Sequence, residues 1–301
     1  MENRILLKVD IAGAISNLQA SMKEFLLKKR LYRLLLRGKG LEFESYNSYS
    51  PGDDASLIDW KASMRSNNIL VKQYRDERNL KVIFLVDVGE NMVFGSSEKL
   101  KCEYTAEIVA AFSHLITTAG DKSGFVFFSD KVKDYIKPSR GKNHLSQFVD
   151  YITNTENYGG FSDLSRGLEF VLDYVRKDVE SVVIVSDFLS FDEKIKSNLS
   201  SVANKFETTI LMVRDPLDNT LPDVAGEIVV EDPRTGQQLL INPKVAKESY
   251  ESYSNARQEE IRNVCLSNNI DILEILTDTP FVPTLSSFLK GRVKQKLRAP
   301  I

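Results

Sequence analysis

The chain has 301 residues, with 40 basic and 42 acidic side chains and a formal net charge of −2. This length suits one large domain or two modest ones, and the charge balance argues against nucleic-acid binding through bulk charge. No apolar run reaches the ~18 residues of a membrane-spanning helix, and the N-terminus lacks the apolar region of a signal peptide. The two cysteines, Cys102 and Cys265, lack metal-ligand spacing and are expected to be reduced thiols of a cytoplasmic protein.

Three segments follow one another along the chain. Residues 1–40 form the first, where apolar residues recur at three- and four-residue steps and predict a helix over 10–37. Residues 41–79 mix alternating polarity with turn residues and predict a β-rich lobe, which we expect to pair with a hairpin at 226–241. The remainder, 80–301, is expected to be an α/β domain.

The only tryptophan, Trp60, lies among charged residues of the predicted lobe. We interpret it as a buried anchor whose indole N–H finds a carboxylate, and we expect Trp60→Ala to be strongly destabilising. The alternative is an exposed side chain that contacts a partner.

Strands and helices alternate from residue 80 onward. The strands are predicted near 81–87, 123–128, 181–186, 208–213 and 270–276. The helices are predicted near 98–118, 142–154, 163–177, 191–205, 244–267 and 281–296. This alternation predicts a mostly parallel sheet that is covered by helices on both faces.

Two of the apolar strands end in an aspartate, Asp87 and Asp187. Ligands of open α/β sheets bind outside the carboxyl ends of the strands, so both side chains are expected at one edge. Asn91 and Ser162 follow on nearby loops and offer an amide and a hydroxyl oxygen, which hard cations such as Mg²⁺ accept as ligands. The spacing equally allows residues that cap helices or accept backbone hydrogen bonds.

Motifs for catalysis are missing from the sequence. There is no phosphate-binding glycine loop, no nucleophile elbow and no zinc-protease motif. Only His114 and His144 could provide imidazole chemistry, and we interpret both as structural. The chain is therefore expected not to be an enzyme.

The segment Asp87-Val-Gly-Glu-Asn91, with Ser162 and Asp187 on later loops, resembles the metal-ion-dependent adhesion site of von Willebrand factor A domains. That family carries Asp-x-Ser-x-Ser, then a loop threonine and a later loop aspartate. Here Gly89 and Asn91 replace the two serines, and Ser162 stands in for the threonine. The resemblance implies a von Willebrand A-like fold with a degenerate site, in which Asp87, Asn91, Ser162 and Asp187 hold Mg²⁺ weakly or not at all.

Longer motifs give a narrower resemblance that covers almost the whole chain. They are Gly40-Leu-Glu-Phe43, Tyr49-Ser-Pro-Gly-Asp-Asp-Ala-Ser-Leu-Ile-Asp-Trp60, Leu70-Val-Lys-Gln-Tyr-Arg-Asp-Glu77, Ala119-Gly-Asp-Lys-Ser-Gly-Phe125 and Asp232-Pro-Arg-Thr-Gly236. They are similar to the bacterial von Willebrand A-like domain of unknown function number fifty-eight. That resemblance implies a MoxR-type AAA+ ATPase as genomic partner and no established biochemical activity.

These observations favour a non-enzymatic interaction module, an adaptor or partner of a MoxR-type ATPase. Its binding surface is expected on the loops 88–97, 157–163 and 187–192, which we call the crown. The alternatives are a metal-free scaffold and a metal-dependent hydrolase or phosphotransferase; Gly89 argues against the latter because it stands where a general acid–base carboxylate is needed. We interpret the basic residues of the helices at 23–39 and 289–298 as solvent-exposed. The alternative is that these helices contact a membrane surface or a partner protein.

Overall fold

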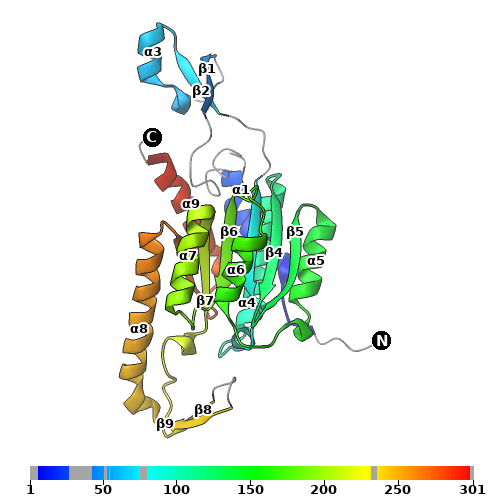
Figure 1. Cartoon of the computed structure of the whole chain (residues 1–301), viewed down its shortest axis with the longest axis vertical. Coiled ribbons are helices and arrows are strands. Elements are labelled where there is room, and N and C mark those ends of the chain that lie inside the picture. Colours follow the sequence, from blue (N-terminus) through cyan, green and yellow to red (C-terminus); the bar gives the residue numbers. More distant parts are fainter. Residues whose placement is uncertain are drawn as a thin grey trace.

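A computed structural model describes residues 6–26, 43–50, 53, 55–74, 80–231 and 236–298. They form a three-layer α/β domain with two small appendages (Figure 1). The first helix, α1, spans Ile11–Leu26; its expected continuation to residue 37, with the basic residues at 28–39, lies outside the described residues. Residues 233–235 of the expected hairpin turn at 233–236 also lie outside the described residues.

The central sheet has six strands in the order β10-β7-β6-β3-β4-β5. Their bounds are β3 Lys81–Asp87, β4 Lys122–Phe128, β5 Val132–Ser139, β6 Ser181–Ser186, β7 Glu207–Arg214 and β10 Asp271–Leu276. Neighbours are parallel except for the edge strand β5, which pairs antiparallel with β4. The mostly parallel sheet is thus confirmed. The sequence pattern missed β5, because this half-exposed strand carries charges and Pro138 instead of an apolar run.

Side chains of each strand alternate between two apolar cores. In β3, Phe84 belongs to one core, whereas Ile83 and Leu85 belong to the other. The first core is covered by α1, α4 Lys101–Thr118, α5 Lys142–Ile152 and α9 Phe281–Arg298. The second is covered by α6 Leu164–Tyr174, α7 Glu193–Lys205 and α8 Pro243–Ser267. Burial on both faces explains the uninterrupted apolar runs of the strands.

A small lobe precedes the sheet. It consists of β1 Phe43–Ser48, the 3-10 turn η1 Ala55–Leu57, α3 Trp60–Ser66 and β2 Leu70–Tyr74, with β1 antiparallel to β2. Asp59 caps α3, since its Oδ1 accepts from the backbone N–H groups of Lys61 and Ala62, each at 3.0 Å.

Trp60 is 63% exposed, so its interpretation as a buried anchor is wrong. The physical reason is the size of the lobe. Among its described residues, only Ser63 and Val71 are buried, which is too little core to enclose an indole ring.

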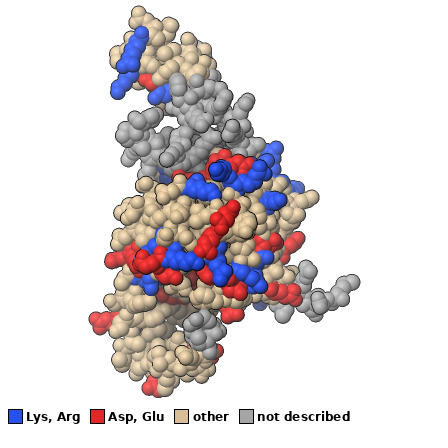
Figure 2. Space-filling view, viewed as in Figure 1, with Lys and Arg blue, Asp and Glu red and all other residues tan. Residues whose placement is uncertain are grey.

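The second appendage is the hairpin of β8 Ile228–Glu231 and β9 Gln238–Ile241. It and the lobe form separate two-stranded sheets, so the expected pairing between them is wrong. The lobe leads into the amino end of β3 and the hairpin follows the carboxyl end of β7, which places them at opposite ends of the molecule (Figure 1). Between these ends, basic and acidic side chains lie interspersed on the face seen in Figure 2.

Candidate functional site at the carboxyl ends of the strands

Asp87 ends β3 and is buried beneath the crown. Its Oδ1 accepts from the backbone N–H of Gly89 at 2.9 Å. Its Oδ2 accepts from the hydroxyls of Ser162 at 2.7 Å and Ser186 at 2.8 Å. Burial and the nearby charge of Asp187 raise the pKa of Asp87 to about 6, against the lowering effect of these hydrogen bonds.

Asn91 joins the two strand-end aspartates. It lies in the 3-10 turn η2, Glu90–Met92, and its Nδ2 donates to Asp87 Oδ2 at 3.2 Å and to Asp187 Oδ2 at 2.9 Å. Its Oδ1 is buried and has no hydrogen-bond partner among the described residues. A Cβ on Gly89 would stand 2.4 Å from this Oδ1 and 3.1 Å from Asp87 Oδ1. The glycine that replaces a motif serine therefore makes room for Asn91.

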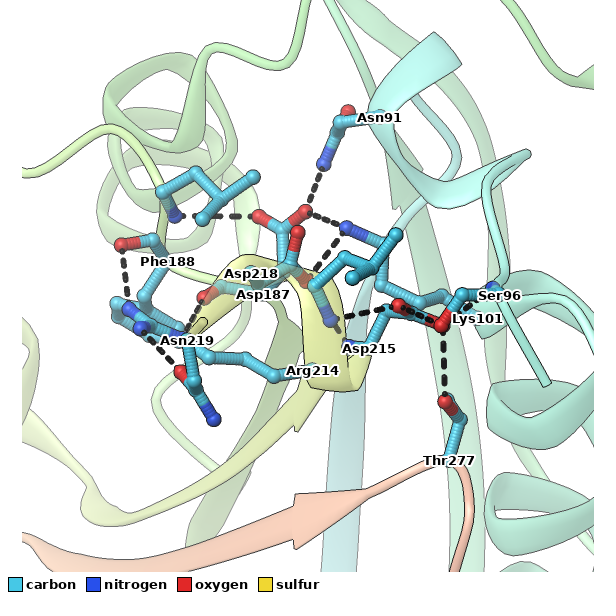
Figure 3. Close-up of polar contacts among 12 residues, drawn as sticks. Asn91, Ser96, Lys101, Asp187, Phe188, Arg214, Asp215, Asp218, Asn219 and Thr277 are labelled. Atoms are coloured by element: carbon cyan, nitrogen blue, oxygen red, sulfur yellow. Dashed lines mark hydrogen bonds and ion pairs between the residues drawn. The ribbon is translucent and has the colours of Figure 1, made fainter. Parts of the chain in front are cut away.

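Asp187 has a second, cationic partner that the sequence analysis did not identify. Lys101, the first residue of α4, places its Nζ 2.7 Å from Asp187 Oδ2 and 3.0 Å from Asp218 Oδ2 (Figure 3). Its side chain is 1% exposed. Burial alone would lower the pKa of Lys101, but the charges of Asp187 and Asp218 outweigh it and raise the pKa above its usual value.

Arg214 fixes the backbone of the loop that begins at Asp187. From the end of β7 its Nε donates to the Asp187 carbonyl at 3.0 Å, and its Nη2 donates to the Phe188 carbonyl at 3.4 Å (Figure 3). Phe188 has a φ of 54°, a left-handed conformation that is uncommon for a bulky residue. The guanidinium thus stabilises a loop turn that would otherwise be strained.

The pocket of the crown has a volume of about 150 Å³. Its lining includes the polar residues Asn91, Ser162, Ser186 and Asp187 and the apolar residues Phe161 and Leu189. Glu90 also lines it, but its Oε1 accepts from the backbone N–H of Gly160 at 3.2 Å, so the carboxylate turns toward the neighbouring loop. Each of the three crown loops carries exposed apolar side chains, namely Val93, Phe94, Phe161 and Leu189, of which Phe161 and Leu189 line the pocket.

The structure brings together all four residues that were predicted for a cation site. It also adds Ser186, Lys101 and Asp218, of which Ser186 could have been suspected because it directly precedes Asp187. Lys101 and Asp218 could not, since a lysine at a helix start and an aspartate in a short turn carry no motif. Asp163 is an ordinary helix cap, because its Oδ1 accepts from the backbone N–H of Arg166 at 3.3 Å.

This donor set does not fit a bound divalent cation. Such a cation needs oxygen atoms directed at it, whereas Asn91 directs its amide N–H₂ at both carboxylates. The position beside Asp187 Oδ2 is taken by the Lys101 ammonium group. Among the described residues, no group of three or more His, Cys, Asp or Glu side chains is arranged to hold a metal ion. Internal donors satisfy the carboxylates instead.

The two histidines lie outside this site. His144 Nε2 is 2.6 Å from the carbonyl oxygen of Ser123, and His114 Nε2 is 2.9 Å from Gln19 Nε2. Burial lowers the pKa of both imidazoles, which favours their neutral form.

A mostly parallel sheet between two helical layers, with a pocket beyond its strand ends, defines the class of open-sheet α/β proteins. Within that class, a family model described as "Protein of unknown function DUF58" matches residues 45–261, and the chain belongs to this family. An uncharacterized protein from Mycobacterium bovis is 23% identical over 263 residues, which cover 86% of this chain and 81% of that protein.

Solved structures with a similar fold include the conserved hypothetical protein BatB from Bacteroides thetaiotaomicron. It has a TM-score of 0.49 and 11% identity, and the match covers 73% of this chain and 100% of BatB. The von Willebrand A domain of SpRpn10 has a TM-score of 0.37 and 10% identity over 72% of this chain and 95% of that domain.

The expected cytoplasmic location needs correction. Another neighbour, from Bacteroides fragilis, is described as an aerotolerance-related membrane protein; its TM-score is 0.47 with 10% identity, over 72% of this chain and 99% of that one. This description contradicts the expectation, which we withdraw. Within the described part of the chain, no helix combines the length and apolar character needed to cross a bilayer.

Proposed function

We propose that this protein is a non-enzymatic interaction module that binds another protein through its crown. The observation that carries the proposal is the set of four exposed apolar side chains on the crown loops, Val93, Phe94, Phe161 and Leu189, of which Phe161 and Leu189 line the pocket. They come from three loops and are between 43% and 49% exposed. A group of exposed apolar residues around a concave site is typical of a protein-binding surface.

The loops are held in shape before any partner binds. Ser96, on the loop that carries Phe94, donates from its backbone N–H and its hydroxyl to Asp215 at 2.7 Å and 2.6 Å. The Glu90 backbone N–H donates to the Gly160 carbonyl at 3.0 Å and joins two crown loops. Pre-organised loops lose little conformational entropy on binding, which favours affinity.

The partner that the family resemblance implies is a MoxR-type AAA+ ATPase. In this proposal the protein is an adaptor or partner of that ATPase, and the crown is its contact surface. The carboxylates beneath the crown would shape the loops, since internal donors already satisfy them.

A metal-dependent hydrolase or phosphotransferase is the less favoured alternative. A nucleophilic Asp87 would need accessible carboxylate oxygens, but the residue is 1% exposed and its oxygens accept four hydrogen bonds from the chain. Gly89 supplies no acid–base group two positions further on. We therefore expect no phosphatase activity toward a generic aryl phosphate with or without added Mg²⁺.

The test is a pull-down with a MoxR-type AAA+ ATPase from the same organism. Phe161→Ser and Leu189→Ser should each weaken binding. The matched control is Tyr174→Ser, because Tyr174 is 68% exposed on α6, outside the crown. If all three variants bind as well as the wild type while a charge-reversed Lys290/Lys294/Lys296 variant fails, the contact lies on α9 and the crown proposal is wrong.

A further inference from the structure

We propose that Lys101 acts as a tethered internal cation that holds the crown loops in place of a metal ion, so that removing its charge opens a site for a hard divalent cation between Asp187 and Asp218. The inference deepens the proposed function, because it rests on the crown as the working surface. Its test measures metal binding and does not require the partner.

The contacts of Lys101 place its ammonium group at the junction of the crown with the sheet. Nζ lies between Asp187 Oδ2 and Asp218 Oδ2, at 2.7 Å and 3.0 Å. It is also 5.7 Å from the ring centroid of Phe94, one of the exposed apolar residues of the crown. The Lys101 backbone N–H donates to the Phe94 carbonyl at 2.8 Å. One residue therefore connects the loop after β3, the loop after β6 and the turn after β7.

Apart from its contacts with the two carboxylates, the environment of Lys101 is unfavourable for a lysine. A buried ammonium group has lost its hydration, and a positive charge in the first turn of a helix opposes the helix dipole. Lys101 has both properties, since it begins an 18-residue helix and its side chain is 1% exposed. The two carboxylates offset these costs. The carboxylate pair and the ammonium group therefore depend on one another.

While Lys101 is present, the site has one excess negative charge, which is half of what a divalent cation would neutralise. Three carboxylates, Asp87, Asp187 and Asp218, face two cations, Lys101 and Arg214. Removing the ammonium leaves three carboxylates and one guanidinium, and a divalent cation would neutralise the resulting excess of two negative charges. The same removal vacates the space between Asp187 Oδ2 and Asp218 Oδ2.

Asn91 can complete the ligand set once the ammonium group is gone. Its Oδ1 is buried without a partner among the described residues, while its Nδ2 faces Asp87 and Asp187. Rotation of the amide exchanges the two atoms and directs an oxygen at the site. Together with the carboxylates of Asp187 and Asp218, this amide oxygen supplies the kind of ligands that Mg²⁺ and Mn²⁺ accept.

The experiment compares Mn²⁺ binding by the wild type, Lys101→Met and Lys101→Arg, measured by calorimetry and by electron paramagnetic resonance of free Mn²⁺. Methionine keeps an unbranched side chain without charge, and arginine keeps the charge. We expect no binding tighter than about 1 mM for the wild type and Lys101→Arg, and binding at least ~10-fold tighter for Lys101→Met. Mg²⁺ should raise the Tm of Lys101→Met and leave that of the wild type unchanged.

A second variant covers the case in which Lys101→Met does not fold. Lys101→Gln removes the charge, keeps an N–H donor for the two carboxylates, retains Asp187, Asp218 and Asn91, and should bind Mn²⁺ more tightly than the wild type. The inference is overturned if a folded charge-deleted variant binds no more tightly than the wild type. It is equally overturned if the wild type binds Mn²⁺ and Asp187→Asn abolishes that binding. Neither result bears on the pull-down, so failure of this inference and failure of the crown proposal remain distinguishable.

Discussion

Lys101 Nζ lies 2.7 Å from Asp187 Oδ2, although 86 positions of the chain separate the two residues. One begins α4 and the other follows β6, and both are almost completely buried. Asn91 donates to the same Asp187 oxygen and so extends the contact to Asp87. The carboxyl edge of the sheet is thereby held together by donors that belong to the chain itself.

Removing the Lys101 ammonium should destabilise the protein. Lys101→Ala leaves two buried carboxylates without their cation, so we expect a loss of about 3–5 kcal/mol in the free energy of unfolding. Urea denaturation measures this loss, with the exposed Lys61→Ala as the matched control. In a double-mutant cycle, Lys101→Ala/Asp218→Asn should lose less than the sum of the two single changes. Additive losses would mean that the two residues do not interact.

Asp87 should give the protein a measurable pH dependence. Its pKa in the folded state is raised to about 6 from an ordinary value of 3.8, so the folded state binds the proton more tightly than the unfolded state. This contribution to stability is complete below pH 3.8 and is lost as the pH rises through about 6. Between pH 4 and 7, the free energy of unfolding of the wild type should therefore fall by roughly 2–3 kcal/mol relative to that of Asp87→Asn. A constant difference over that range would contradict the raised pKa.

Trp60→Ala should leave the stability of the protein nearly unchanged. The side chain is 63% exposed, and substitutions at exposed positions away from special contacts usually change the free energy of unfolding by ~0.5 kcal/mol or less. Differential scanning calorimetry can compare it with Phe84→Ala, whose fully buried ring should cost about 3–5 kcal/mol. A loss for Trp60→Ala as large as that for Phe84→Ala would show that the indole is enclosed in solution.

Restoring the serine of the adhesion motif at position 89 should destabilise the site. The new Cβ would stand 2.4 Å from Asn91 Oδ1, so either the asparagine or the loop must move, at a cost of about 1–3 kcal/mol. Thermal denaturation of Gly89→Ser measures it. Asn91→Ala in the same chain should recover part of the loss because it removes the clashing oxygen. Equal stability of Gly89→Ser and the wild type would mean that Asn91 Oδ1 does not lie close to position 89.

Both cysteines should be unreactive in the folded protein. Burial is the main reason that the pKa of Cys102 and of Cys265 is raised to about 12, so almost no thiolate exists at neutral pH. Labelling with a thiol reagent should therefore proceed only after denaturant is added. Rapid labelling of either thiol in native buffer would contradict this burial.

The sequence alone predicted the architecture of the sheet domain. The apolar runs at 81–87 and 181–186 have no polar face, and only a strand that is buried on both sides accommodates them. Because parallel strands end at a common edge, the convergence of Asp87 and Asp187 followed from the same pattern. Asn91 and Ser162 were placed correctly since they lie on the loops that begin or end at that edge.

Only the tertiary structure decided what surrounds those carboxylates. Lys101 has no motif, and its pairing with Asp187 and Asp218 depends on how α4 packs against the sheet. The lobe and the hairpin show the same alternation of polar and apolar residues, so the sequence pattern could not show that they form separate sheets. They are separate because the lobe precedes the amino end of β3 whereas the hairpin follows the carboxyl end of β7. Exposure of Trp60 likewise depends on how much core its lobe can assemble. Local patterns determine which segments become strands and helices, whereas contacts between distant residues are set by packing, which no local pattern encodes.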